Sequence, residues 1–221
     1  MKSLKYLFKR GFRPIRTSIL SVFAVAMPVL IMIFHDNAAS EDYLISKIAL
    51  NCGTMLMHMA LVMLLCTETT GNRLIRSAPI SKELRTFGIP MFNILLGASA
   101  AAVTLLPYTI FILASGLPLS HLSDTIIVTA VMIFFFIILG TVALHLRYGM
   151  VLLIYAYIPV CGLMFFLSDD QWNNGFGMEL WLSAVISGAL IAAAIATVFI
   201  ISRLFYKHSD FKAYQQNLSS T

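Results

Sequence analysis

The sequence predicts an all-α polytopic membrane protein with six transmembrane helices and an N-terminal amphipathic helix in the membrane interface. Of the 221 residues, 59 % are apolar and only 11 % are charged, whereas a soluble domain has about 25 % charged residues. The apolar residues form long continuous runs, which disfavours a β-barrel with its alternating pattern. One span needs about 20 mostly apolar residues, so this composition allows about six spans.

Six apolar runs mark the expected spans. Their approximate bounds are 17–34, 43–66, 87–113, 122–145, 150–167 and 179–205. The fifth run is one of the two shortest and contains a proline and a glycine, so a re-entrant segment is the alternative at that place. The predicted organisation is an interfacial helix over 1–14, a six-helix transmembrane domain over 15–206 and a cytoplasmic tail over 207–221.

Lysine and arginine sort to one side of the predicted spans. With both termini in the cytoplasm, 14 of the 15 lysines and arginines face the cytoplasm, and Lys47 is the exception. The positive-inside rule therefore predicts a multi-pass protein of the cytoplasmic membrane with both termini inside. Two cytoplasmic termini require an even number of spans. Because the charges follow topology and form no phosphate-binding face, no nucleic-acid partner is expected.

The N-terminal segment 1–14 separates into two faces when it is drawn as a helix. Leu4 and Leu7 lie on the apolar face, and Lys5 lies on the basic face. Such a helix lies flat, with its apolar face at the acyl boundary and its cations near anionic headgroups. Pro14 ends it before the first span. A cleaved signal peptide is the alternative, but the apolar stretch of 18 residues that follows is longer than a usual signal core.

The largest internal cytoplasmic connection is the loop 67–86. Thr70 is placed to cap a short helix, and Pro79 ends it. Ser81 can cap the next helix, which runs into the third span. The short helix carries an apolar patch made of Leu74, Ile75 and Ala78. A partly apolar helix exposed to the cytoplasm is a docking element for another protein, and the alternative is a merely solvated loop.

This loop, the six-span order and the basic leader resemble the permeases of ATP-binding-cassette (ABC) exporters of the second type. The likeness is greatest to the short permeases of peptide and drug exporters in Gram-positive bacteria. The matching residues are Glu68, Leu74, Ser77, Ala78, Pro79, Ile80 and Ser81. The resemblance implies that the loop is the coupling helix held in a groove of the ATPase subunit, with Arg73 and Ile75 in the same contact. It also implies that the leader is the elbow helix.

The resemblance implies the function of a permease subunit that exports a peptide, an antimicrobial or another amphipathic substrate. Two permease subunits, identical or different, would form the pathway, each docked on an ABC ATPase subunit that holds ATP and Mg²⁺. The chain has no P-loop and no H-E-x-x-H pattern, so we expect no enzyme activity, cofactor or metal on it. The alternative is a stand-alone membrane immunity or sensor protein that binds a peptide without transport.

A polar stripe follows the second predicted span. It consists of Lys47, Asn51, Thr54 and His58 at helical spacing. Polar groups in hydrocarbon are costly, so the stripe should face the protein interior. It then either lines a substrate pathway or forms hydrogen bonds between helices. Asn93, Thr104 and Tyr108 on the third span are candidates to face it.

Small residues gather on two predicted spans. One group is the run from Gly97 to Ala102 in the third span, and the other is Gly188, Ala192 and Ala196 in the sixth. Small side chains let helix backbones approach closely. Both groups are therefore predicted to be helix-packing faces with no chemical role.

Overall fold

The computed structural model describes part of the chain. The described residues are 5–7, 48, 51, 62, 81–146 and 175–208. Within them the regular structure is helical throughout, and three helices are long and apolar enough to cross a membrane. These three correspond to the third, fourth and sixth predicted spans. The other three predicted spans lie outside the described residues, apart from single helical positions.

The helices begin and end close to the predicted bounds. They are α5 (Ser81–Glu83), the π-helix η2 (Leu84–Gly88), α6 (Ile89–Ser115), α7 (Leu119–Leu146) and α10 (Leu180–His208). The first three follow one another without a break, so a helix runs from Ser81 into the third span as the sequence predicted. The 27 to 29 residues of α6, α7 and α10 span about 40–44 Å. This exceeds the hydrocarbon thickness of about 30 Å, so the helices tilt or extend past it.

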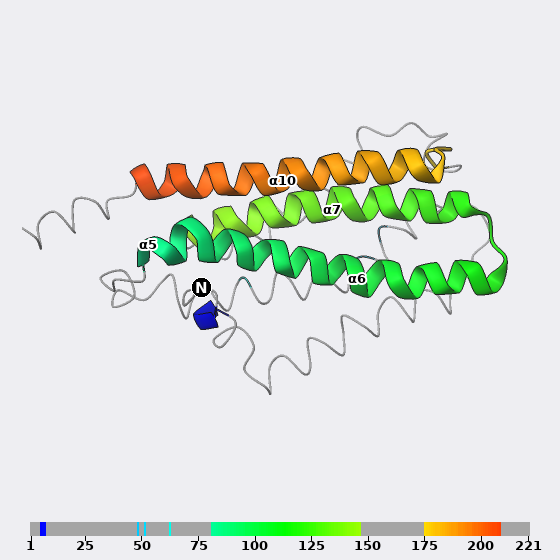
Figure 1. The fold of residues 1–221 in the computed structure, drawn as a ribbon, viewed down its shortest axis with the longest axis horizontal. Helices are drawn as coiled ribbons and strands as arrows, with labels where there is room; N and C mark the ends of the chain where they lie inside the picture. Colours follow the sequence, from blue (N-terminus) through cyan, green and yellow to red (C-terminus); the bar gives the residue numbers. More distant parts are fainter. Residues whose placement is uncertain are drawn as a thin grey trace, which may run out of the picture.

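The helix α7 lies between α6 and α10, packs against both along its length, and is the most buried of the three (Figure 1). It runs antiparallel to α6, and α10 runs in the same direction as α7. Apolar contacts join all three helices at two levels. One cluster contains Ile137 and Val198, and the other contains Tyr108, Ile112 and Leu122 with Leu180 packed against it.

The small residues of α6 form a packing face, as predicted, on one side of that helix. A Cβ atom added at Gly97 would lie 2.8 Å from Cδ1 of Ile137 and 3.1 Å from Cγ2 of Ile133. Gly97 therefore lets α6 approach α7 more closely than any side chain would. Ala100, one turn further along, is buried on the same face, whereas Ala98 points outward.

The prediction of a helix-packing face on α10 is wrong for the described fold. A Cβ atom at Gly188 would meet nothing within 4 Å, and Ala192 and Ala196 are exposed. Trp181 and Val185 continue this exposed surface, with 63 % and 60 % of their area accessible. The face is apolar along its length, which fits contact with lipid.

Only residues 5–7 of the predicted N-terminal helix are described, and they are helical. Lys5 is exposed and Leu7 is fully buried, so the two side chains lie on opposite faces as expected. Leu7 packs within the protein, whereas the sequence placed it against the acyl chains. The rest of the segment 1–14, most of the loop 67–86 and nearly all of the tail lie outside the described residues.

Gly97→Val should destabilise the fold much more than Gly188→Val. Both changes add the same β-branched side chain to a helix, but only the first drives it into a neighbouring helix. Overpacking typically costs about 1–3 kcal/mol, and this cost should appear at position 97 alone. The midpoint of thermal unfolding in detergent measures the difference. Equal losses in the two variants would contradict the packing described for Gly97.

Candidate functional site

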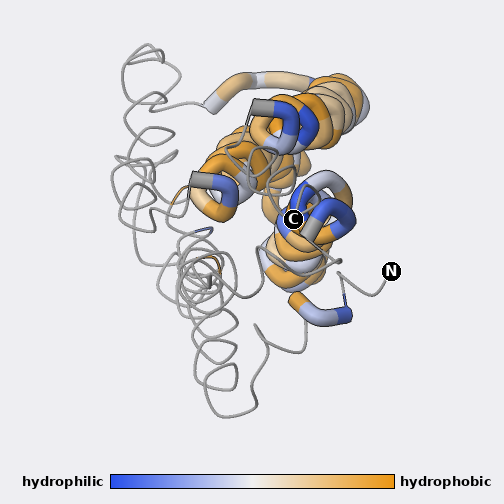
Figure 2. Tube along the Cα trace, turned by 90° about the vertical axis from the view of Figure 1, so that its left-hand side faces the viewer, coloured by the Kyte–Doolittle hydropathy of each residue, from blue (hydrophilic) through white to orange (hydrophobic). Residues whose placement is uncertain are grey.

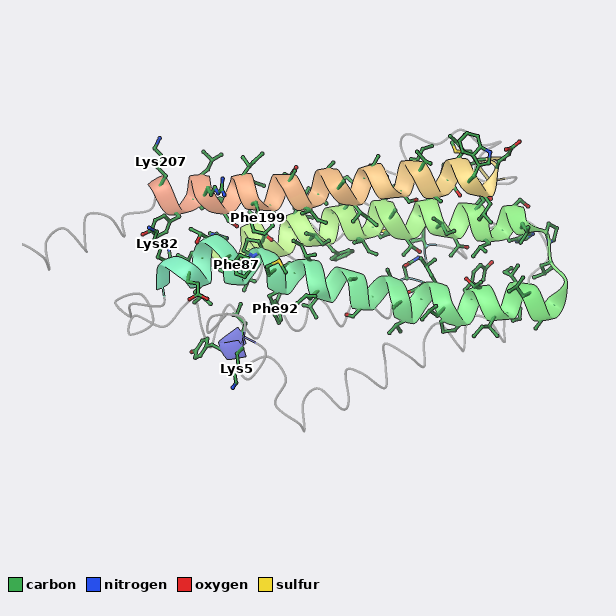
Figure 3. The ribbon with its side chains drawn as sticks, in the orientation of Figure 1. Lys5, Lys82, Phe87, Phe92, Phe199 and Lys207 are labelled. Atoms are coloured by element: carbon green, nitrogen blue, oxygen red, sulfur yellow. The ribbon has the colours of Figure 1, made fainter. Side chains whose placement is uncertain are left out.

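One end of the three helices carries the basic residues. In the segments 81–146 and 175–208 the lysines and arginines are Lys82, Arg85, Arg203 and Lys207. All four lie where α6 begins and α10 ends, and Figure 3 labels Lys82 and Lys207 there. We call this the basic end. Figure 2 looks along the helices from this side and shows hydrophilic segments at the near ends of otherwise hydrophobic tubes.

The helix that enters α6 widens into a π-turn at the basic end. The N–H of Ile89 donates to the carbonyl of Leu84, five residues back, over the π-helix Leu84–Gly88. Pro90 explains the widening, because a proline has no N–H and its ring clashes with the carbonyl four residues earlier. In this turn the Thr86 hydroxyl donates to the Lys82 carbonyl at 2.8 Å. Such π-turns inside α-helices are rare and frequently lie at functional sites.

His145 connects this π-turn to the other two helices. Its Nε2 atom lies 3.2 Å from the Arg85 carbonyl oxygen, and its Nδ1 atom lies 2.8 Å from the Thr141 carbonyl oxygen. The ring stacks on Phe205 of α10, with centroids 5.4 Å apart. The imidazole therefore touches η2, the last turns of α7 and the last turns of α10.

A second contact joins η2 to α10 directly. The rings of Phe87 and Phe199 lie with their centroids 6.4 Å apart. Figure 3 labels the two side chains near each other at the basic end. Phe199 also packs on the buried cluster that contains Ile137 of α7. A displacement of the π-turn is thus opposed by both α7 and α10.

Polar side chains form a buried seam between α6 and α7. The Asn93 amide donates to the Ile89 carbonyl at 3.1 Å and to the Thr141 hydroxyl at 3.3 Å. Tyr108 faces the Thr125 side chain near the other end of the seam. Asn93, Thr104 and Tyr108 are all buried. The sequence proposed that they face the stripe on the second span, of which the structure describes Asn51. Asn93 and Tyr108 each have a described partner on α7, so these two side chains join α6 to α7.

The end opposite the basic end is held by a buried carboxylate. Asp124 Oδ1 accepts a hydrogen bond from the Phe176 N–H at 3.1 Å, and the Ser123 hydroxyl donates to the Met178 carbonyl at 2.9 Å. Asp124 is 1 % exposed and lies inside α7. These bonds fix the segment that leads into α10 against the start of α7.

The structure describes two of the residues predicted for function. Ser81 is the first described residue of the helical segment that leads into α6, and Asn51 is helical and only 3 % exposed, as an inward-facing stripe requires. The other predicted coupling and stripe residues lie outside the described part; they are Glu68, Arg73, Leu74, Ile75, Ser77, Ala78, Pro79, Ile80, Lys47, Thr54 and His58. The sequence analysis did not single out His145. The sequence feature that could have indicated it is its position at the end of a span, one helical turn after Thr141.

No family model, curated protein or solved structure matches this chain. Among the described residues, no group of three or more histidines, cysteines, aspartates and glutamates could hold a metal ion. The contacts at the basic end are hydrogen bonds to carbonyl groups and aromatic stacking. Such contacts can transmit movement between helices.

Asp124→Ala should loosen the segment before α10, whereas Asp124→Asn should not. The alanine variant loses the acceptor for the Phe176 N–H, and the asparagine variant keeps one. Leaving a buried N–H without its acceptor costs about 1–3 kcal/mol, so hydrogen exchange at the Phe176 amide should accelerate at least about fivefold in the alanine variant. Equal exchange rates in wild type and Asp124→Ala would show that this bond does not hold the segment.

Proposed function

We propose that this chain is the membrane-spanning permease subunit of an ATP-driven ABC exporter. One observation carries the proposal. Residues 81–88, at the end of the predicted coupling loop, form a helix that runs directly into α6 and contacts α7 and α10. A partner that displaced the loop would therefore act on three spans at once. The resemblance of the loop to the coupling helix of these permeases supports the same conclusion.

The distribution of charge supports the orientation that this function needs. The basic end gathers the lysines and arginines of the described helices, and the predicted coupling loop enters the bundle there. By the positive-inside rule this end faces the cytoplasm, where ATP is available to an ATPase. Both termini then lie in the cytoplasm and the chain is a multi-pass protein of the cytoplasmic membrane.

The remaining parts of the proposal follow from this role. The ATPase subunit binds ATP and Mg²⁺ and performs the hydrolysis, and this chain contributes no catalytic residue. A second permease subunit, identical or different, completes the pathway. The exported molecule is a peptide, an antimicrobial or another amphipathic substrate. Closure of the ATPase shifts the spans between two arrangements with different access.

A cysteine at the basic end should react only from the cytoplasmic side. With the three native cysteines replaced by serine, Lys82→Cys in intact cells should resist a membrane-impermeant maleimide, and Ser120→Cys should react. Both side chains are exposed and lie at opposite ends of the helices. Labelling of both cysteines in intact cells would contradict the orientation. Inside-out vesicles should give the reverse pattern and serve as the control.

Leu74→Asp should detach or uncouple the ATPase, whereas Arg76→Ala should have little effect. A buried leucine contributes roughly 1.5–3 kcal/mol, and an exposed ion pair contributes about 0–1 kcal/mol. Binding in the first variant should thus weaken at least about tenfold. The measurement is the amount of a Walker-motif ATPase that co-purifies with each variant from the native host, together with its ATP hydrolysis.

Two outcomes of that experiment would overturn the proposal. An intact and active complex that carries Leu74→Asp would show that the loop is not the coupling element. If no Walker-motif ATPase accompanies the wild-type chain, a stand-alone peptide-binding immunity or sensor protein becomes the better explanation.

A further inference from the structure

Three exposed cations lie on two helices that meet at the basic end. Arg203 and Lys207 are exposed on α10, and Lys82 is exposed on α5, which leads into η2. Figure 3 labels Lys82 and Lys207 at the same end of the bundle. We call the surface made of these three residues the cationic surface.

The aromatic contact between η2 and α10 sets the position of these cations. The ring centroids of Phe87 and Phe199 lie 6.4 Å apart. Lys82 precedes Phe87 by about one turn, and Arg203 follows Phe199 by one turn. Both cations are therefore displaced from the ring contact in the same direction, toward the outer edge of the bundle.

An exposed apolar surface lies next to the cations, on the side of the membrane interior. Ile200, Arg203 and Lys207 are three and four residues apart, so they share one face of α10, and Ile200 is the deepest of them. Ile200 and Phe87 are both among the exposed large hydrophobic residues. Cations at the membrane boundary with apolar groups directly beneath them match the two parts of a lipid, its headgroup and its acyl chains.

The net charge of the cationic surface selects an anionic headgroup. Glu83 is the acidic residue among the described residues of the basic end, and it is half-buried, whereas the three cations are exposed. Lysine and arginine donate charge-assisted hydrogen bonds to phosphate oxygens. The described residues of the opposite end, 115–124 and 175–182, contain no lysine or arginine. Charge complementarity therefore favours an anionic lipid at the basic end.

We infer that the cationic surface binds an anionic phospholipid of the leaflet at the basic end. The phosphate group lies among Lys82, Arg203 and Lys207, and an acyl chain lies over Phe87 and Ile200. The bound lipid joins the helix that enters α6 to the last turns of α10 from outside the bundle. This site goes beyond the proposed function and needs no ATPase, so the purified chain alone can test it.

Native mass spectrometry of the chain in detergent measures the lipid preference. Phosphatidylglycerol should bind the wild type at least about tenfold more tightly than phosphatidylcholine with the same acyl chains, because each nearby cation contributes a factor of about five. In Lys82→Gln/Arg203→Gln/Lys207→Gln this preference should disappear. Lys207→Gln alone should weaken phosphatidylglycerol about fivefold, whereas Lys212→Gln, which changes the net charge equally, should not.

A second pair of variants tests the position of the acyl chain. Ile200→Ser should weaken phosphatidylglycerol severalfold, and Val185→Ser should not. Both residues are β-branched, lie on α10 and are about equally exposed, at 59 % and 60 %, but Val185 lies near the opposite end. Glycerol 3-phosphate, which has the headgroup chemistry without acyl chains, should not displace the lipid at equal concentration.

Four outcomes would overturn the inference. They are equal binding of the two lipids by the wild type, an unchanged preference in the triple variant, displacement by glycerol 3-phosphate at equal concentration, and equal effects of Ile200→Ser and Val185→Ser. A triple variant that keeps its lipid preference but no longer retains an ATPase would assign the cations to a protein partner instead. Arg203→Lys keeps the charge and should keep the preference, which separates loss of the site from loss of the fold.

Discussion

The close contact between Gly97 and Ile137 fixes how α6 and α7 align, and the rest of the described structure follows from this alignment. Moving one turn along each helix from that contact brings Asn93 opposite Thr141, where the two side chains bond. One further turn along α7, and two turns back along α6 and η2, bring His145 to the π-turn and its Arg85 carbonyl. A larger side chain at position 97 would separate the helices and weaken both pairs.

The requirement to satisfy polar groups away from water explains why the seam is built in this way. A membrane interior offers no water to an unpaired N–H or carbonyl group, so each one must find a protein partner. Asn93 and Thr141 each bond a carbonyl of their own helix, and Asn93 also bonds Thr141. Interhelical bonds of this kind are individually weak, on the order of 0.6 kcal/mol. Their main effect is to select one alignment among several that apolar packing alone would allow.

Hydropathy and charge predicted what depends on composition, namely the helical class, the location of three spans and the clustering of cations at one end. They could not predict which small residues touch a neighbouring helix. Gly97 and Gly188 sit in similar small-residue patterns, yet only Gly97 faces α7. The link between Arg85 and His145 was equally hidden, because the partners are 60 residues apart and the bond uses a backbone carbonyl. Of the residues that resemble the coupling loop of the permeases, Ser81 lies in the described helices. The other residues of that set precede Ser81 in the sequence.

The tight turn between α6 and α7 gives the two helices one common point about which they can rotate. Only three residues separate the helices, and Gly116 turns the chain with a φ of 66°. The short loop limits how far apart the two helices can lie at that end, so a rotation about the loop displaces their other ends most. For a rod of about 42 Å, each degree of rotation moves the far tip by about 0.7 Å. His145 lies near that tip, where about one degree takes its 3.2 Å contact with Arg85 past ordinary hydrogen-bond length. The contact between His145 and Arg85 therefore lies where a given rotation about the loop produces the largest displacement.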